Sequence, residues 1–324
     1  MRNAWLFSVG ATVLAAGFAY GQATSTGSGQ AFPNRPIRMV TSSVGSGNDA
    51  VARLIAPGIA GPLGQQVIVE NRPSGTIPID LVAKAEADGY TVLLYGGTIW
   101  IMPLLQRTPY DPINDFAPIT LVEKAPLVLV VNPTVAANSV RELIALAKAK
   151  PGALNYASAA TGSSTHLAAE LFKSMAGVDM VRVNYKGGAA AATDLIAGQV
   201  QLMFFSPPPV MPHVKTGRLR ALAVTSREPS ALAPGLPTVE ASGLPGFESV
   251  TVTGIFAPAK TPVTVIRRLN QEIVRLVTTP EAKEKFFSSG SEVVGSTPEQ
   301  LATAGRSETA KWGKLIKDTG IRAE

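Results

Sequence analysis

The 324-residue chain has no cysteine, few aromatic residues and little charge, and each shortage excludes a class of function. Without cysteine there is no disulfide, no thiolate nucleophile and no cysteine-ligated zinc or iron–sulfur centre. Two histidines, His166 and His213, are too few for a histidine-rich metal centre. Aromatic residues make up 6% of the chain, which disfavours a surface that stacks bases or sugars. We therefore expect neither a metal nor a cofactor.

The excess of positive charge is mild. The chain carries 29 Lys and Arg against 23 Asp and Glu, a net charge of +6. This excess favours a small anionic ligand over a cationic one, but nucleic-acid binding needs a clustered basic face, so we expect no nucleic-acid partner. Hydrophobic residues make up 46%, enough for a sizeable core, and the length suggests about two domains.

The N-terminal segment has the layout of a secretory signal peptide. Arg2 precedes an apolar run over residues 4–19, which is short for a membrane span, and Gly21-Gln22-Ala23 offers a cleavage site between small residues. We expect residues 1–23 to be removed, with an uncleaved anchor as the alternative, and residues 24–30 to form a flexible leader. An exported chain without cysteine fits a bacterial periplasm.

The rest of the chain alternates short apolar runs with segments of helical periodicity. A continuously apolar run at 127–131 predicts a strand buried on both faces, and Ser139 begins a helix with Glu142 at the capping-box position. This alternation indicates an α/β fold with mostly parallel sheets. We place one domain at 31–124 plus 251–324 and the other at 125–250, with the last two helices packed on the first. The predicted strands are 37–41, 66–70, 90–95, 127–131, 155–158, 181–185, 200–205 and 219–225.

Two loops rich in glycine and serine follow predicted strands, at Thr41–Asp49 and Ser158–Thr165. In open α/β sheets, ligands bind at the carboxyl ends of the strands. Glycine lets the backbone approach an anion, and amide N–H and hydroxyl groups donate to it. Neither loop has the glycine spacing of a nucleotide-binding motif, which disfavours a nucleotide. Two such loops across a cleft would suit a carboxylate or a dicarboxylate, whereas plain turns are the alternative for each.

Support for catalysis is thin. The Gly-x-Ser-x-Gly nucleophile motif is absent. His166 lies beside Ser163 and Ser164, but without an orienting acid nearby we favour a histidine that bonds the local loop. We interpret Pro207–Pro209 as a stiff connection and Trp312 as a core aromatic residue. We therefore expect that the protein is not an enzyme.

Nine short motifs occur in order along the chain: Phe32–Arg38, Val69–Pro73, Asp88–Thr91, Asn155–Ser158, Thr165–Leu167, Tyr185–Gly187, Leu219–Thr225, Gly243–Glu248 and Ala257-Pro258. Together they resemble the Bug (TctC-like) family, the periplasmic substrate-binding proteins of tripartite tricarboxylate transporters. The resemblance implies a two-domain Venus flytrap fold of the type II periplasmic-binding-protein class, with a hinge cleft. It also implies capture of a small organic acid for membrane permease subunits, by a protein that we expect to be a monomer.

The resemblance also implies a set of ligand-binding residues. In the family, both loops hold the ligand carboxylate through backbone amides, hydroxyls and bridging waters. The loop after Pro73, the turn after the third strand and a polar residue before Pro207 line the same cleft. Carried over by position, the set is Ser42, Ser43, Gly45, Ser46, Gly47, Asn48, Asp49, Thr76, Gly97, Thr98, Ser158, Thr161, Gly162, Ser163, Ser164, Thr165 and Ser206.

The chain departs from the family pattern near this cleft. Ser42, Val44 and Ser46 stand where the first loop usually has Phe, Pro and Gly, and the loop after Pro73 is shorter than usual. Val252-Thr253 replaces a common aromatic pair. We interpret these changes as an altered pocket for an unusual acid, with bulkier and aromatic acids among the candidates.

Three alternatives stay open. The same fold serves as an effector domain in cytoplasmic regulators, against which the signal peptide argues. The protein could present its ligand to a membrane sensor kinase instead of a permease. It could also be a periplasmic hydrolase that uses Ser163 or Ser164 with His166.

Overall fold

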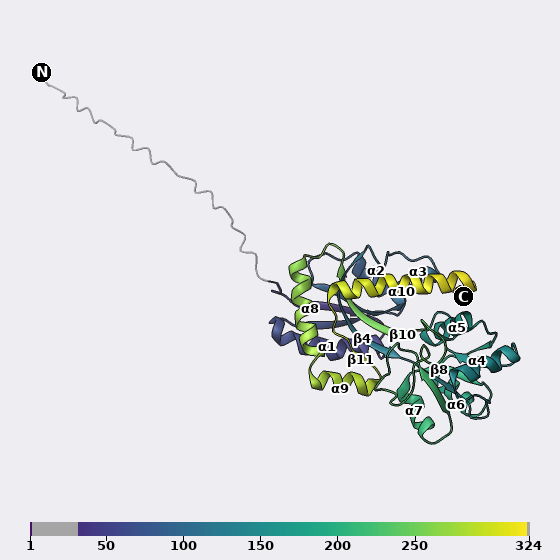
Figure 1. The fold of residues 1–324 in the computed structure, drawn as a ribbon. Helices are drawn as coiled ribbons and strands as arrows, with labels where there is room; N and C mark the ends of the chain where they lie inside the picture. Colours follow the sequence, from purple (N-terminus) through teal and green to yellow (C-terminus); the bar gives the residue numbers. More distant parts are fainter. Residues whose placement is uncertain (2–31, 323–324) are drawn as a thin grey trace. The chain divides into compact units, whose positions relative to one another are not determined.

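The computed structural model describes Met1 and residues 32–322. The predicted signal peptide and leader, 1–23 and 24–30, lie outside the described residues apart from Met1. From Phe32 onward the chain forms one compact unit (Figure 1). Within the described part of the chain, no helix combines the length and apolar character needed to cross a membrane.

The first sheet has the strand order β11-β4-β10-β3-β1-β2. Parallel pairing is confined to β2-β1-β3, whose strands are joined by the helices α1 and α2, and β10 runs antiparallel to both of its neighbours, β3 and β4. The strands are β1 (Ile37–Thr41), β2 (Val67–Asn71), β3 (Thr91–Gly96), β4 (Phe116–Pro126), β10 (Val250–Pro258) and β11 (Glu292–Val293).

The second sheet has the order β7-β6-β8-β5-β9. Again one half is parallel, β7-β6-β8, and β5 runs antiparallel to β8 and β9. All four residues of β5 are fully buried, as its continuously apolar sequence predicts. The strands are β5 (Val128–Val131), β6 (Asn155–Ser158), β7 (Val181–Asn184), β8 (Leu202–Phe205) and β9 (Arg220–Val224).

The α/β class is confirmed, as is each predicted strand, but the prediction of mostly parallel sheets is wrong for these mixed sheets. Parallel neighbours need a crossover connection, usually a helix. Such crossovers link β1 to β2 and β6 to β7, whereas β4 passes into β5 through a single residue, Leu127. The strands that enter and leave the second sheet therefore run against their neighbours.

Ten helices of the described chain connect and cover these strands. Ser139 caps α4 by accepting from the Glu142 N–H, and Thr297 and Gln300 form a complete capping box at α10. Pro207–Pro209 is the first turn of a helix, not the stiff connection that we predicted, because proline suits the start of a helix. The helices are α1 (Gly47–Leu63), α2 (Thr76–Ala83), α3 (Thr98–Leu105), α4 (Val140–Ala149), α5 (Ser164–Ala176), α6 (Gly188–Ile196), α7 (Pro207–Lys215), α8 (Val263–Val277), α9 (Pro280–Ser289) and α10 (Pro298–Thr319).

The long helix α10 packs against elements of both sheets. It contacts β4 and α3, and also α5, which follows a strand of the second sheet (Figure 1). Trp312, Leu315 and Ile316 of α10 and Ile101 of α3 belong to the same buried cluster as the core of the second sheet. The contacts with β4 and α3 agree with the expectation that the last two helices pack back on the first unit, and the contact with α5 comes in addition.

Three phenylalanines form the aromatic centre of that cluster. The Phe204 ring lies 5.8 Å from the Phe172 ring and 6.2 Å from the Phe247 ring, and all three are fully buried. Aromatic pairs at such distances add stability beyond the area that they bury. The cluster joins β8, α5 and the segment before β10.

We expect Phe204→Ala to lower the free energy of unfolding by about 3–5 kcal/mol, because it opens a cavity at this centre. Phe287→Ala is the matched control, since Phe287 is 42% exposed. Urea unfolding of residues 24–324, followed by circular dichroism, measures both. Equal midpoint shifts for the two variants would contradict this account of the core.

Candidate functional site

Three helices begin around one cavity of about 190 Å³. Helix α1 follows β1, α3 follows β3 and α5 follows β6, so each begins just past the carboxyl end of a strand. This is where open α/β sheets place their ligands. The lining residues are Asn48, Gly96, Gly97, Thr98, Ile101, Gly162, Ser164, Leu167, Ser249, Val250, Thr251, Val252, Glu308 and Trp312.

The helix starts supply hydrogen-bond donors to the cavity, and their residues on its lining carry no charged side chain. The first backbone N–H groups of a helix have no carbonyl partner within it, and the helix dipole makes this end favourable for anions. Ser46 caps α1 and Ser163 caps α5, each through its side-chain oxygen, whereas Gly97 at α3 has no side chain to do so. The Gly97 N–H itself donates to Val252 O of β10 at 2.8 Å.

The buried carboxylate of Asp49 fixes the first loop. Its Oδ2 accepts from the Gly45 N–H at 2.8 Å, and its Oδ1 accepts from Asn71 Nδ2 at 2.8 Å and pairs with Arg53 Nε at 2.9 Å. Burial raises the pKa of Asp49, but the Gly45 and Asn71 hydrogen bonds and the Arg53 guanidinium outweigh burial and hold the pKa below its usual value. The Asp49 oxygens therefore face the loop and its supports.

Hydroxyl groups of the first loop bond to one another and to neighbouring segments of the chain. Ser42 Oγ lies 2.8 Å from Ser46 Oγ and accepts from Asn48 Nδ2 at 3.2 Å. Ser43 Oγ accepts from the Ser74 N–H at 3.0 Å, which ties this loop to the loop before α2. The first loop is thus a cross-linked structure before any ligand arrives.

Arg182 of β7 holds the second loop. Its guanidinium donates to Ser158 Oγ at 2.8 Å, to Thr161 Oγ1 at 3.0 Å and to Ala159 O at 2.8 Å. The planar guanidinium can bind three acceptors at once, which a lysine could not do with the same geometry. Arg182 is not among the residues predicted for the site.

The turn into α5 is held by His166. The Gly162 N–H donates to His166 Nδ1 at 3.2 Å, and Ser163 Oγ accepts from the His166 N–H at 3.3 Å. Gly162 has a φ of +79°, and a Cβ there would lie 2.6 Å from Leu105 Cδ1. Both the left-handed backbone and the close approach of α3 therefore require glycine at this position.

The structure brings part of the predicted set together on the cavity. Asn48, Gly97, Thr98, Gly162 and Ser164 line it. The other residues of the two loops brace these positions or flank them, while Thr76 begins α2 and Ser206 precedes α7, both outside the lining. The bracing and flanking residues are Ser42, Ser43, Gly45, Ser46, Gly47, Asp49, Ser158, Thr161, Ser163 and Thr165.

Sequence reasoning missed most of the remaining wall. Residues 249–252 at the start of β10 form one part, and of these only Val252 was predicted to lie near the cleft. Glu308 and Trp312 of α10 form another, and Gly96, Ile101 and Leu167 complete it. Trp312 is a core aromatic residue, as predicted, and also lines the cavity. The one sequence signal for this part of the wall is the four-residue spacing of Glu308 and Trp312, which places both on the same face of a helix.

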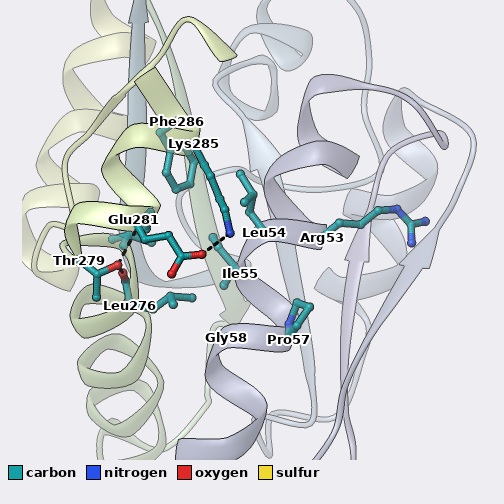
Figure 2. A pocket seen from close by; sticks show the side chains of 12 residues that line it. Arg53, Leu54, Ile55, Pro57, Gly58, Leu276, Thr279, Glu281, Lys285 and Phe286 are labelled. Atoms are coloured by element: carbon teal, nitrogen blue, oxygen red, sulfur yellow. Dashed lines mark hydrogen bonds and ion pairs between the residues drawn. The ribbon is translucent and has the colours of Figure 1, made fainter. Parts of the chain in front are cut away.

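A second cavity, of about 390 Å³, lies between α1 and the helices α8 and α9 (Figure 2). Its walls include Leu54, Leu276 and Phe286, and a Lys285–Glu281 ion pair of 2.6 Å bridges one side. Figure 2 shows Arg53 extending away from this pair, and its guanidinium binds Asp49 instead. The predicted ligand-binding residues do not line this cavity.

Comparison with known proteins agrees with the motifs. Residues 51–321 match the family model of the tripartite tricarboxylate transporter family receptor, TctC. The chain belongs to this receptor family. The match confirms the resemblance to the Bug and TctC-like proteins.

Relatives of this receptor span nearly its whole length. It is 39% identical to a UPF0065 protein from the tcbD-tcbE intergenic region of Pseudomonas sp. strain P51, over 98% of this chain and 97% of the relative. It is 35% identical to Protein BugT of Bordetella pertussis, over 91% and 92% of the two chains.

Solved structures agree with the fold of the receptor. R. palustris Rpa4515, solved with adipate, is 33% identical with a TM-score of 0.72, over 90% of this chain and all of that one. MatC from Rhodopseudomonas palustris, solved with malate, is 28% identical with a TM-score of 0.70, over 88% and 100%. A TctC solute-binding protein from Polaromonas has a TM-score of 0.82 at 25% identity, over 89% and 99%. These likenesses confirm the two-domain periplasmic-binding-protein fold.

Replacing Asp49 with asparagine tests the role of its carboxylate in the receptor. The new amide group would face the donors Asn71 Nδ2 and Arg53 Nε, and we expect a loss of about 1–3 kcal/mol in the free energy of unfolding at pH 7. Because the folded-state pKa of Asp49 is lowered, its contribution is present above the unfolded value of about 3.9 and is lost as pH falls below it.

Unfolding by urea between pH 3 and pH 7 measures both effects. The difference in the free energy of unfolding between the native protein and Asp49→Asn should shrink toward the acid end of this range. Asp318→Asn is the control, because Asp318 forms an exposed ion pair with Lys314 on α10. A constant difference down to pH 3, or an equal loss in the control, would contradict the assignment.

Proposed function

We propose that this receptor is exported to the periplasm, captures a small carboxylate at the cavity and delivers it to the membrane permease of a tripartite tricarboxylate transporter. The observation that carries the proposal is the meeting of three helix starts on one cavity, between loops that are braced from within. Two solved relatives, Rpa4515 with adipate and MatC with malate, support a carboxylate as the ligand.

Neutral donors suffice for this task. Each helix start favours a nearby anion by about 0.3–1 kcal/mol, and more where the site is partly buried. A carboxylate has two oxygens that together accept several hydrogen bonds, so one group can serve more than one helix start. Asn48 and Ser164 add side-chain donors beside the backbone groups.

We further propose that the two domains are 31–124 with 251–324, and 125–250, and that they close around the ligand as a monomer. The chain passes from one sheet to the other at Leu127, between β4 and β5, and returns along β10. Two crossings of this kind form a hinge in binding proteins that close around a ligand. Residues at the start of β10 line the cavity, so a change at the hinge reaches the ligand directly.

A second candidate, hydrolysis by Ser163 or Ser164 with His166, has less support. His166 Nδ1 accepts from the Gly162 N–H, so the neutral ring carries its proton on Nε2, and neither ring nitrogen is then free to take a proton from a serine. The receptor family also favours binding without chemistry. Presentation of the ligand to a sensor kinase would use the same cavity, and growth with deletion of the permease separates the two outcomes.

Asn48→Asp tests the proposal at the helix start of α1. A carboxylate there suits the helix dipole but repels an anionic ligand, so we expect Kd for the bound acid to rise at least about tenfold, or about 1.4 kcal/mol, with little change in melting temperature. Calorimetric titration of residues 24–324 with adipate, malate, hexanoate and benzoate gives the Kd values.

Ala50→Asp is the matched control, because Ala50 is exposed in the first turn of the same helix and does not line the cavity. Both variants add one negative charge to α1. If they weaken binding equally, or if Asn48→Asp has no effect, the ligand does not bind at the three helix starts.

A further inference from the structure

We propose that the ligand is a monocarboxylate with an uncharged, apolar body, and that Glu308 of α10 disfavours acids with a second carboxylate. The inference rests on the proposed function and adds the class of acid. It sets this receptor apart from its relatives solved with adipate and malate, which are dicarboxylates.

The cavity wall carries a negative formal charge and no positive one among the described residues. Among the residues described around the cavity, Glu308 carries the one formal charge, and that charge is negative. Lysine and arginine are missing from this lining as the structure describes it. The three helix starts can offset one carboxylate, but a second would lie in the same small space as Glu308 with no cationic side chain on the wall.

The Glu308 carboxylate is held in place, so it cannot turn away from an incoming anion without losing its partners. Its Oε1 pairs with Lys311 Nζ at 2.5 Å, and its Oε2 accepts from Trp312 Nε1 at 2.6 Å. Lys311 lies over the Trp312 ring at 4.6 Å and does not itself line the cavity. Exposure of the Glu308 side chain is 13%, so water screens it weakly.

The rest of the wall favours an apolar body. Ile101, Leu167, Val250, Val252 and Trp312 come from three helices and β10 to the same cavity. Apolar contact with such a wall is favourable for hydrocarbon and unfavourable for a charged group that finds no partner there. The cavity volume of about 190 Å³ lies below the range of sites for drug-sized ligands and suits a small acid.

Glu308 would act in opposite ways on the two charged ends that a ligand could carry, because it repels a carboxylate and attracts an ammonium group. An ammonium group would be attracted to Glu308, but it would have to share the Glu308 oxygens with Lys311 and Trp312, and the Lys311 ammonium beside Oε1 would repel it. A neutral methyl end meets no such cost. The geometry therefore favours a neutral end over either charged one.

Three acids of the same chain length separate these cases: hexanoate, 6-aminohexanoate and adipate. Trp312 lines the cavity, so intrinsic fluorescence of residues 24–324 reports binding, with calorimetry for the Kd values. We expect hexanoate to bind at least tenfold more tightly than either of the others. Benzoate against terephthalate repeats the comparison with an aromatic body.

Glu308→Gln removes the charge and keeps an oxygen that can accept from Trp312 Nε1. We expect the ratio of the adipate Kd to the hexanoate Kd to fall about tenfold in this variant. Glu299→Gln, an exposed residue in the first turn of the same helix, should leave the ratio unchanged. Melting temperatures check that both variants are folded. The comparison of the three acids on the native protein tests the ligand preference even if neither variant folds.

The outcomes are distinct. Tighter binding of adipate or malate than of hexanoate overturns the inference and leaves the proposed function standing. Tightest binding of 6-aminohexanoate overturns it in favour of an amino acid. A ratio that does not change in Glu308→Gln removes Glu308 as the cause of any preference. If no acid of any class binds, the proposed function fails and the inference fails with it.

Discussion

Unpaired backbone N–H groups at three helix starts decide what the cavity can hold. The first N–H groups of α1, α3 and α5 cannot bond within their own helices, and a folded chain must satisfy them with caps, water or a ligand. Ser46 and Ser163 each satisfy one of these groups, and Gly97 donates to β10. An anion with two acceptor oxygens can satisfy several of those that remain. The sheets matter to function because the strands β1, β3 and β6 all end beside this cavity.

Two charged side chains of opposite sign brace the loops that carry these helix starts. Asp49 accepts hydrogen bonds within the first loop, and Arg182 donates them within the second. Neither residue lines the cavity, so both charged groups hold the loops in place and do not contact the ligand space. A loop whose hydrogen bonds are already formed before the ligand arrives loses little conformational freedom on binding. This preorganisation favours affinity. The surface that meets the ligand can then stay largely neutral.

The sequence predicted what depends on neighbouring residues. The strand positions, the cap at Ser139 and the two glycine- and serine-rich loops all carry local signals, and the structure contains each of them, with some strand ends shifted by one or two residues. Pairing between β4 and β10 joins residues more than a hundred positions apart, so no local pattern showed that the sheets are mixed. Arg182 occupies an ordinary position in a short strand, and nothing beside it reveals the loop that it holds. Glu308 reaches the cavity because α10 packs against α3 and α5, two of the helices that begin there.

The charge of the whole chain and the charge of the cavity wall have different consequences. The net charge of +6 creates a long-range field that favours the approach of any anion, and salt screens this field beyond about 8–10 Å. Glu308 acts at contact distance and is mostly buried, so salt screens it far less. The two effects also differ in kind, because the field acts on the rate of encounter, whereas the wall acts on the stability of the bound state. A chain with a positive surplus can therefore attract dicarboxylates more strongly in solution and still hold a monocarboxylate more tightly once it is bound.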